Sequence, residues 1–177
     1  MKKQKIKFFE AVNQGLDVSM KKDSNVCLIG LGVSDPKGIF GTTLDLSKKY
    51  GQHRVIESPI SENGITGISI GLSLTGFKVL LVHQRVEFAL LSIEQIFNNA
   101  AKSLYVTNGK HNIPIVIRLI IGRGWGQGPQ HSKTLHSWFA NLPGISVVYP
   151  SSPYEAKGLL LGSIFSFPSP SKVMIND

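Results

Sequence analysis

The sequence predicts an α/β fold, a three-layer sandwich in which a mostly parallel, six-stranded sheet lies between two layers of helices. Short runs of β-branched and aliphatic residues alternate with segments in which apolar residues recur at helical spacing. The run at residues 113–121 is apolar at nearly every position, as is typical of a strand buried on both faces of a parallel sheet. Helices between such strands would form right-handed crossovers.

The expected elements follow one another along the whole chain. The first helix is expected from residue 6 to residue 16, where apolar side chains recur on one face. The strands are expected at residues 26–29, 53–56, 77–82, 113–121, 145–149 and 172–175. The remaining helices are expected at about residues 42–50, 61–75, 87–105, 132–140 and 153–164.

Capping residues support some of these boundaries. Thr42 or Thr43 is expected to cap the short second helix, which Gly51 would close. Ser61 is expected to cap the next helix. The helix at residues 87–105 has the clearest pattern, because an apolar stripe continues along its whole length.

Length and composition indicate one domain over residues 1–177. A chain with 42% apolar residues can bury one sizeable core. The uncharged run at residues 63–77 is shorter than the roughly 20 residues needed to cross a bilayer, so no membrane span is expected. The basic N-terminus lacks the apolar region of a secretory signal. Cys27, the single cysteine, lies in an apolar run and is expected to be a buried thiol. We therefore expect a cytoplasmic protein.

The net charge of +8 raises the question of nucleic-acid binding. The lysines occur in small groups at the ends of elements, without a basic helix and without interleaved aromatic residues for base stacking. This distribution argues against a nucleic-acid partner. A solvated surface is the simplest interpretation, and a basic face for an acidic protein partner remains open.

Polar and glycine-rich segments follow four of the expected strands. Ligands of open parallel sheets bind outside the carboxyl ends of the strands. The four segments together contain two glycine-rich loops and also carboxylate, histidine, arginine and aromatic side chains. They occupy residues 30–41, 57–64, 83–88 and 122–132. The sequence therefore predicts a site at one edge of the sheet.

Several common sites do not fit the spacing. The glycines of residues 122–132 fall at every second position, which is not the G-x-G-x-x-G spacing of dinucleotide-binding proteins. The phosphate loop and the G-x-S-x-G elbow of serine hydrolases are absent from the sequence. His131 and His136 are too poorly aligned on a helix, and too isolated from other ligands, to predict a zinc site.

Glu62 is the carboxylate of greatest interest, because it stands where an expected strand gives way to a glycine-rich helix. From the residues alone, it could equally be a first-turn residue that the helix dipole favours. Phe88 could likewise be a core aromatic residue, and His131 a capping or surface residue.

Four motifs, in order and at matching spacing, resemble the transketolase-type pyrimidine-binding domain. They are Pro-Ile-Ser-Glu62-Asn-Gly-Ile-Thr-Gly, Phe88 before Ser-Ile-Glu-Gln-Ile-Phe-Asn-Asn-Ala-Ala-Lys102, Gln130-His-Ser132, and Leu142-Pro-Gly-Ile-Ser-Val-Val-Tyr-Pro150. More narrowly, the chain resembles the β subunit of the decarboxylating component of 2-oxoacid dehydrogenases that act on pyruvate or branched-chain substrates. The resemblance covers essentially all 177 residues.

The resemblance implies thiamine diphosphate as the cofactor, and the fold of the enzymes that bind it. Glu62 would contact N1′ of the aminopyrimidine ring and exchange a proton with it. Phe88 would pack against the face of that ring, and His131 would lie near the reacting centre. His83 and Arg85, which precede Phe88, would line the same pocket.

Two departures from the family pattern bear on the partner. Many members have a glutamate where this chain has Leu31, so proton communication between paired sites is in doubt. The Gly-Asp-Gly motif that helps to hold Mg²⁺ and the diphosphate is absent from the sequence. The resemblance therefore implies that a diphosphate-binding, α-type subunit supplies that site in a homodimer or α2β2 heterotetramer, and that the chain is inactive without it.

The family usually continues into a C-terminal domain after this point, and these 177 residues do not include one. The chain would then be either a natural half-subunit or a shortened piece. Two functions remain open: the pyrimidine-binding half of a 2-oxoacid dehydrogenase or transketolase-like enzyme, or a non-catalytic scaffold that keeps the fold. The joint presence of Glu62, Phe88 and His131 favours the enzyme.

Overall fold

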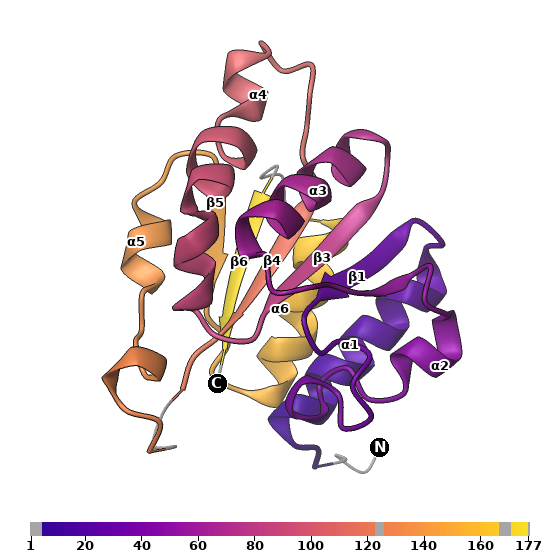
Figure 1. The fold of residues 1–177 in the computed structure, drawn as a ribbon. Coiled ribbons are helices and arrows are strands. Elements are labelled where there is room, and N and C mark those ends of the chain that lie inside the picture. The colour runs from indigo at the N-terminus through magenta and orange to yellow at the C-terminus, as the bar shows by residue number, and fades with distance from the viewer. Residues whose placement is uncertain (1–4, 123–125, 167–170, 177) are drawn as a thin grey trace.

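The computed structural model describes residues 5–122, 126–166 and 171–176. Its centre is a six-stranded sheet with the order β2-β1-β3-β4-β6-β5, in which every neighbouring pair of strands is parallel (Figure 1). The strands are β1 (Val26–Gly30), β2 (Val55–Glu57), β3 (Lys78–His83), β4 (Ile115–Ile120), β5 (Ile145–Val148) and β6 (Ser171–Asn176). The predicted α/β fold is confirmed, and the described strand pairs are entirely parallel.

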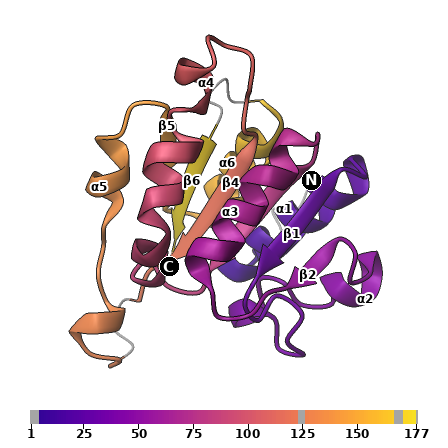
Figure 2. The ribbon, with the colours of Figure 1, turned by 45° about the horizontal axis from the view of Figure 1, so that its top comes forward.

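Helices cover both faces of the sheet. The helices α1 (Phe8–Lys22) and α6 (Pro153–Phe165) pack on one face, and α3 (Glu62–Leu74) lies on the other with the chain segment of residues 88–106 (Figures 1 and 2). Alternate residues of each strand face opposite layers, because successive side chains of a strand point to opposite faces. The result is two apolar cores, one on each side of the sheet.

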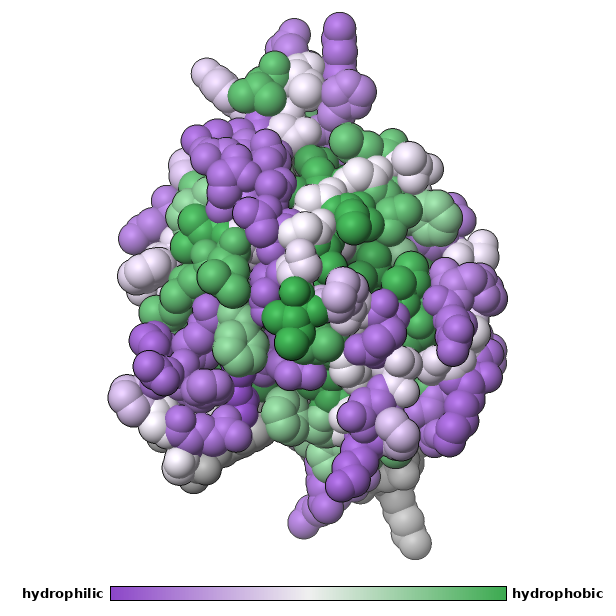
Figure 3. All heavy atoms as spheres, in the orientation of Figure 1, coloured by the Kyte–Doolittle hydropathy of each residue, from purple (hydrophilic) through white to green (hydrophobic). Residues whose placement is uncertain are grey.

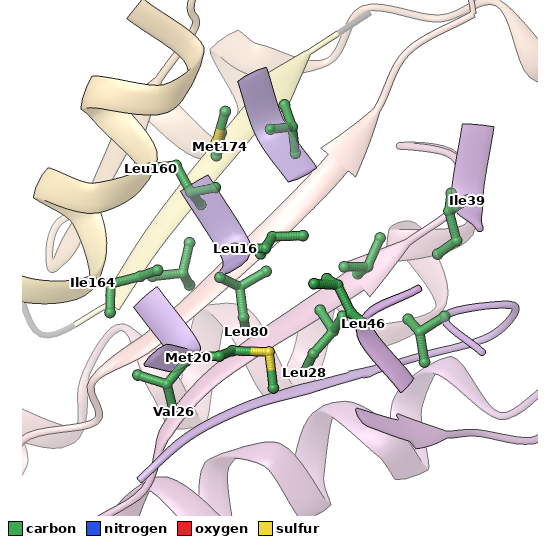
Figure 4. Close-up of a cluster of buried hydrophobic side chains, with 14 of the residues drawn as sticks. Leu16, Met20, Val26, Leu28, Ile39, Leu46, Leu80, Leu160, Ile164 and Met174 are labelled. Carbon is green, nitrogen blue, oxygen red and sulfur yellow. The ribbon is translucent and has the colours of Figure 1, made fainter. Parts of the chain in front are cut away.

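The core under α1 and α6 shows how closely the layers approach. Leu16 of α1 and Leu160 of α6 lie over Leu28 and Leu80 of the central strands (Figure 4). Gly15 allows this contact, since a Cβ atom there would lie 3.0 Å from the side chain of Leu160. Burial of these side chains, each worth about 1.5–3 kcal/mol, holds this layer against the sheet.

The prediction of one long, regular α-helix at residues 87–105 is wrong. The segment is instead a 3-10 turn η2 (Phe88–Ser92), a π-helical stretch η3 (Gln95–Ala100) and a short helix α4 (Ser103–Val106). Ala101 N–H donates to the oxygen of Ile96, five residues earlier. The wider turn keeps both Ala100 and Ala101 buried against their neighbours.

The predicted capping residues have other roles. Helix α2 (Leu46–Tyr50) begins after the two threonines, whose hydroxyls bond to Ile39 in the preceding turn. Gly51 ends α2 with φ of 78°, as predicted. The side chain of Ser61 makes no capping hydrogen bond to α3.

Most other boundaries shift by a few residues. Strand β2 lies two residues later than expected at its amino end, and β4 is shorter at both ends. The short turns are η1 (Ile39–Gly41) and η4 (Pro129–His131), and α5 (His136–Ala140) begins later than the expected residue 132. None of the helices in the described part of the chain is long and apolar enough to span a membrane.

Candidate functional site

The carboxyl ends of the strands bring three of the predicted residues to one shallow hollow. Glu62, half-buried, is the first residue of α3; His83 ends β3; and Phe88 begins η2. The lining residues are Leu31, Pro59, Glu62, Ile65, Val82, His83, Gln84 and Phe88. Two larger cavities, of about 740 and 720 Å³, are lined by residues of other parts of the molecule. We place the candidate site at Glu62, because this hollow lies at the carboxyl ends of β1 and β3, where the sequence predicts a site. Two further cavities, of about 500 and 390 Å³, also have an acidic residue and a phenylalanine in their lining.

His83 lies deep in the wall of this hollow. Its side chain and backbone are only 3% exposed. Burial lowers the pKa of His83 to about 4, so its imidazole is neutral near pH 7. Its Nε2 atom lies 3.4 Å from the Thr66 hydroxyl oxygen and 3.5 Å from that of Ser92.

Phe88 and His131 meet although they come from different loops. Their rings contact edge to face with centroids 5.6 Å apart. Close backbone approach holds the His131 turn in place: a Cβ atom on Gly122 would lie 2.3 Å from the His131 carbonyl oxygen, so only glycine fits there. Glu87, next to Phe88, accepts a hydrogen bond of 2.6 Å from the backbone N–H of Lys133.

Arg85 does not line the hollow. Its guanidinium donates to the side-chain oxygen of Gln127 and lies 5.2 Å from the centre of the Phe40 ring. Burial lowers the pKa of Arg85, and the nearby Glu87 carboxylate partly offsets this. Arg85 is therefore adjacent to the hollow and not among its lining residues, unlike His83. Residues 123–125 of the predicted glycine-rich loop lie outside the described residues.

The structure adds Glu57, Leu31 and Gln84 to the site. The Glu57 carboxylate accepts hydrogen bonds from the N–H of Gly32 and from the N–H and hydroxyl of Ser34. Burial raises the pKa of Glu57, but these hydrogen bonds outweigh it and hold the pKa below its usual range. Gln84 donates to the Leu31 carbonyl oxygen at 2.9 Å. Together the two side chains fix the loop that carries Leu31 into the hollow.

The hollow encloses only about 10 Å³, so a ligand would lie against its surface. Its walls are largely aliphatic, Phe88 offers a half-exposed ring face, and Glu62 supplies one carboxylate at the rim. Within the described ranges, no three histidine, cysteine or acidic side chains gather in a way that could hold a metal ion. The lining therefore offers one carboxylate and one aromatic ring to a planar group lying against it.

Comparisons with known proteins identify the family of the chain. Residues 4–176 match the family described as transketolase, pyrimidine binding domain. The chain is 40% identical over 160 residues to the pyruvate dehydrogenase E1 component subunit beta of Porphyra purpurea, covering 90% of this chain and 48% of that protein. The corresponding mitochondrial subunit of Pisum sativum is 40% identical over 155 residues, with coverage of 88% and 43%.

A solved structure shows the same fold. The protein titled "Split gene transketolase, inactive beta4 tetramer" superimposes with a TM-score of 0.75 over 98% of this chain and 51% of its own, at 17% identity. The present chain thus spans somewhat less than half the length of the curated relatives above. With its family match along nearly the whole sequence, the chain belongs to the transketolase pyrimidine-binding domain family, and its relatives include β subunits of the pyruvate dehydrogenase E1 component.

Proposed function

We propose that this chain is the pyrimidine-binding half of a thiamine diphosphate-dependent enzyme, either a decarboxylating 2-oxoacid dehydrogenase or a transketolase-like enzyme. The observation that carries this proposal is the common hollow of Glu62, His83 and Phe88 at the carboxyl edge of the sheet. The similarity to E1 β subunits favours a 2-oxoacid as the substrate.

Glu62, Phe88 and His131 have distinct roles in the proposed site. In this proposal Glu62 holds or releases a proton at the edge of the aminopyrimidine ring, and Phe88 packs on the face of that ring; their common hollow supports it. The aliphatic walls exclude water and strengthen the contact with the carboxylate. His131 would donate a hydrogen bond toward the substrate, and its edge-to-face contact with Phe88 supports a position near the site. When bound, the cofactor supplies the carbanion chemistry at C2 of its thiazolium ring.

A partner chain would complete the site. Large apolar side chains are exposed on or next to the elements that carry Glu62 and Phe88: Ile60 is 78% exposed, Ile68 61% and Leu91 64%. Patches of hydrophobic atoms are also visible on the face of the molecule in Figure 3. Exposed apolar side chains grouped beside a site indicate a surface that another chain covers. We propose that an α-type subunit covers this face and supplies the diphosphate and Mg²⁺ site, in an α2β2 heterotetramer.

Cofactor binding tests this proposal. The binding of thiamine diphosphate, with and without Mg²⁺, is measured by calorimetry for the chain alone and for the chain co-purified with an α-type subunit. The proposal predicts weak binding that does not depend on Mg²⁺ for the chain alone, and tight, Mg²⁺-dependent binding for the complex. Tight, Mg²⁺-dependent binding by the chain alone would contradict it.

A further inference from the structure

His83 is the point at which three elements of the candidate site meet. It is the last residue of β3, and its Nε2 atom faces two hydroxyls from other elements. One belongs to Thr66, in the second turn of α3, and the other to Ser92, at the end of η2. These two elements carry Glu62 and Phe88.

Both hydroxyls already donate their protons to backbone oxygens. Thr66 Oγ1 donates to the backbone oxygen of Glu62 at 2.7 Å, and Ser92 Oγ donates to the backbone oxygen of Ala89 at 3.0 Å. A hydroxyl has one proton and two acceptor lone pairs. Only lone pairs therefore remain to face His83, so Nε2 has to be the donor.

The neutral state of the ring then fixes its tautomer. A buried, neutral imidazole has one N–H, and if Nε2 carries it, Nδ1 is a bare acceptor. The single Nε2–H is shared between the two hydroxyl oxygens at distances of 3.4 and 3.5 Å. Three-centre sharing of this kind is consistent with both contacts being long.

We propose that His83 is a positioning residue which, as its neutral Nε2–H tautomer, holds the first turns of α3 against η2 and so fixes Glu62 relative to Phe88. The link to Glu62 runs through Thr66, which bonds to the carbonyl group of Glu62 itself. The link to Phe88 runs through Ser92 to the next residue, Ala89. The consequence for catalysis rests on the proposed function, whereas the tautomer does not.

A neutral donor suits this place better than a cation. Glu62 and His83 line the same hollow, and a positive charge there would favour the ionised carboxylate and lower its affinity for a proton. A neutral N–H gives the same mechanical connection without that charge. Proton exchange between Glu62 and the ring edge of a bound cofactor is then left undisturbed.

The tautomer is measured on the full chain without a partner. Long-range ¹H–¹⁵N spectra of the histidine rings distinguish a protonated Nε2 with a bare Nδ1 from the opposite tautomer and from the imidazolium. We expect the Nε2–H form for His83 from about pH 5 to about pH 8. The Nδ1–H form, or an imidazolium at neutral pH, would overturn the proposal.

Two variants test the positioning role. His83→Gln keeps a donor near the Nε2 position, and His83→Leu removes it. In the complex with the α-type subunit, we expect exchange of the cofactor C2 proton to slow about 10- to 100-fold in His83→Leu and to stay near the wild-type rate in His83→Gln. Equal rates in His83→Leu and the wild type would refute the positioning role.

Glu62→Gln separates this outcome from failure of the proposed function. If Glu62→Gln slows exchange and His83→Leu does not, the function stands and the positioning role falls. If Glu62→Gln leaves exchange unchanged, the proposed function falls, and the ring spectra still decide the tautomer. Should His83→Leu not fold, the spectra of the wild-type chain and the rate of His83→Gln remain decisive, because a slow His83→Gln complex contradicts the donor role.

Discussion

The two segments that follow β2 and β3 make an instructive pair. Both start at the carboxyl edge, both lie on the same face of the sheet, and each contributes to the lining of the hollow. The first is the regular helix α3, which begins with Glu62. The second, residues 88–106, begins with Phe88 and passes through 3-10, π and α geometry. A regular helix can hold a carboxylate at its first turn. Residues 88–106, which we call the broken segment, pack against several neighbours.

The neighbours of the broken segment explain its irregularity. It packs at one end against the His131 turn through Phe88, and at the other against the loop at Gly144, beside Ala101. Helix α3 meets the sheet along one buried stripe and leaves Gly71 open to solvent. We infer that α3 supplies the proposed catalytic carboxylate. Residues 88–106 instead pack between the surrounding loops.

The largest effect is expected at the start of α3. Glu62→Gln keeps the shape of the side chain and removes the exchangeable proton, so activity of the complex should fall about 10²- to 10⁴-fold. The free energy of unfolding should change little, because Glu62 is only half-buried. A 2-oxoacid decarboxylation assay with thermal unfolding checks both. Glu94→Gln, at an exposed position of the broken segment, is the matched control and should be fully active.

The free energy of unfolding should be most sensitive to substitution of Gly144, in the loop that packs against the broken segment at Ala101. Gly144 has φ of 93°, and a Cβ atom there would lie 2.0 Å from the carbonyl oxygen of Ala101. Gly144→Ala therefore combines backbone strain with a direct clash and should lower the free energy of unfolding by about 2–4 kcal/mol. Urea titration of the chain measures the loss. An unchanged midpoint would show that this segment does not depend on the loop.

His83, which contacts both segments, should make the free energy of unfolding depend on pH. Burial holds the pKa of folded His83 at about 4, against an ordinary value of 6.5. Because the unfolded chain binds this proton first, stability is full above about pH 6.5 and falls as the pH drops toward 4, by up to about 3 kcal/mol. Urea titrations across this range measure it. His83→Gln should remove that part of the pH dependence, and His111→Gln, at an exposed position, should retain it.

The smallest effect, and the only stabilising one, is expected within α3. A Cβ atom on Gly71 would meet nothing within 4 Å. Gly71→Ala should therefore raise the free energy of unfolding by up to about 1 kcal/mol, since alanine loses less backbone entropy in a helix. A lower melting temperature of the chain alone would mean that α3 is less regular than described. A loss of partner binding in this variant, with stability raised, would place Gly71 in the interface.

The sequence predicts the fold well because burial and alternation decide it. The uninterrupted apolar run around β4 requires a strand covered on both faces, and the structure has that arrangement. Glu62 and Phe88 could be predicted from their motifs, and their meeting in one hollow follows from the parallel sheet. Apolar spacing alone does not distinguish an α-helix from a π-helical turn, so the break after Ser92 was not visible.

Contacts between distant loops could not be predicted. Glu57 is only five residues before Glu62, but its partners are the amides of Gly32 and Ser34 and the Ser34 hydroxyl, in the loop after β1. Neither the spacing nor the residue types of that loop predict these contacts. The direction of the Arg85 side chain depends on Phe40 and Gln127, which are far from it in the sequence. Thr42 was expected to cap α2, yet its hydroxyl accepts a hydrogen bond from the fully buried Arg118.

The rate at which the C2 proton of thiamine diphosphate exchanges with deuterium tests the central proposal most directly. It is measured for the complex with the α-type subunit in the wild type, in Glu62→Gln and in the control Glu94→Gln. We predict that exchange slows by at least about 100-fold in Glu62→Gln alone, with cofactor binding retained. An exchange rate in Glu62→Gln equal to that of the wild type would contradict the assignment of Glu62 as the activating carboxylate.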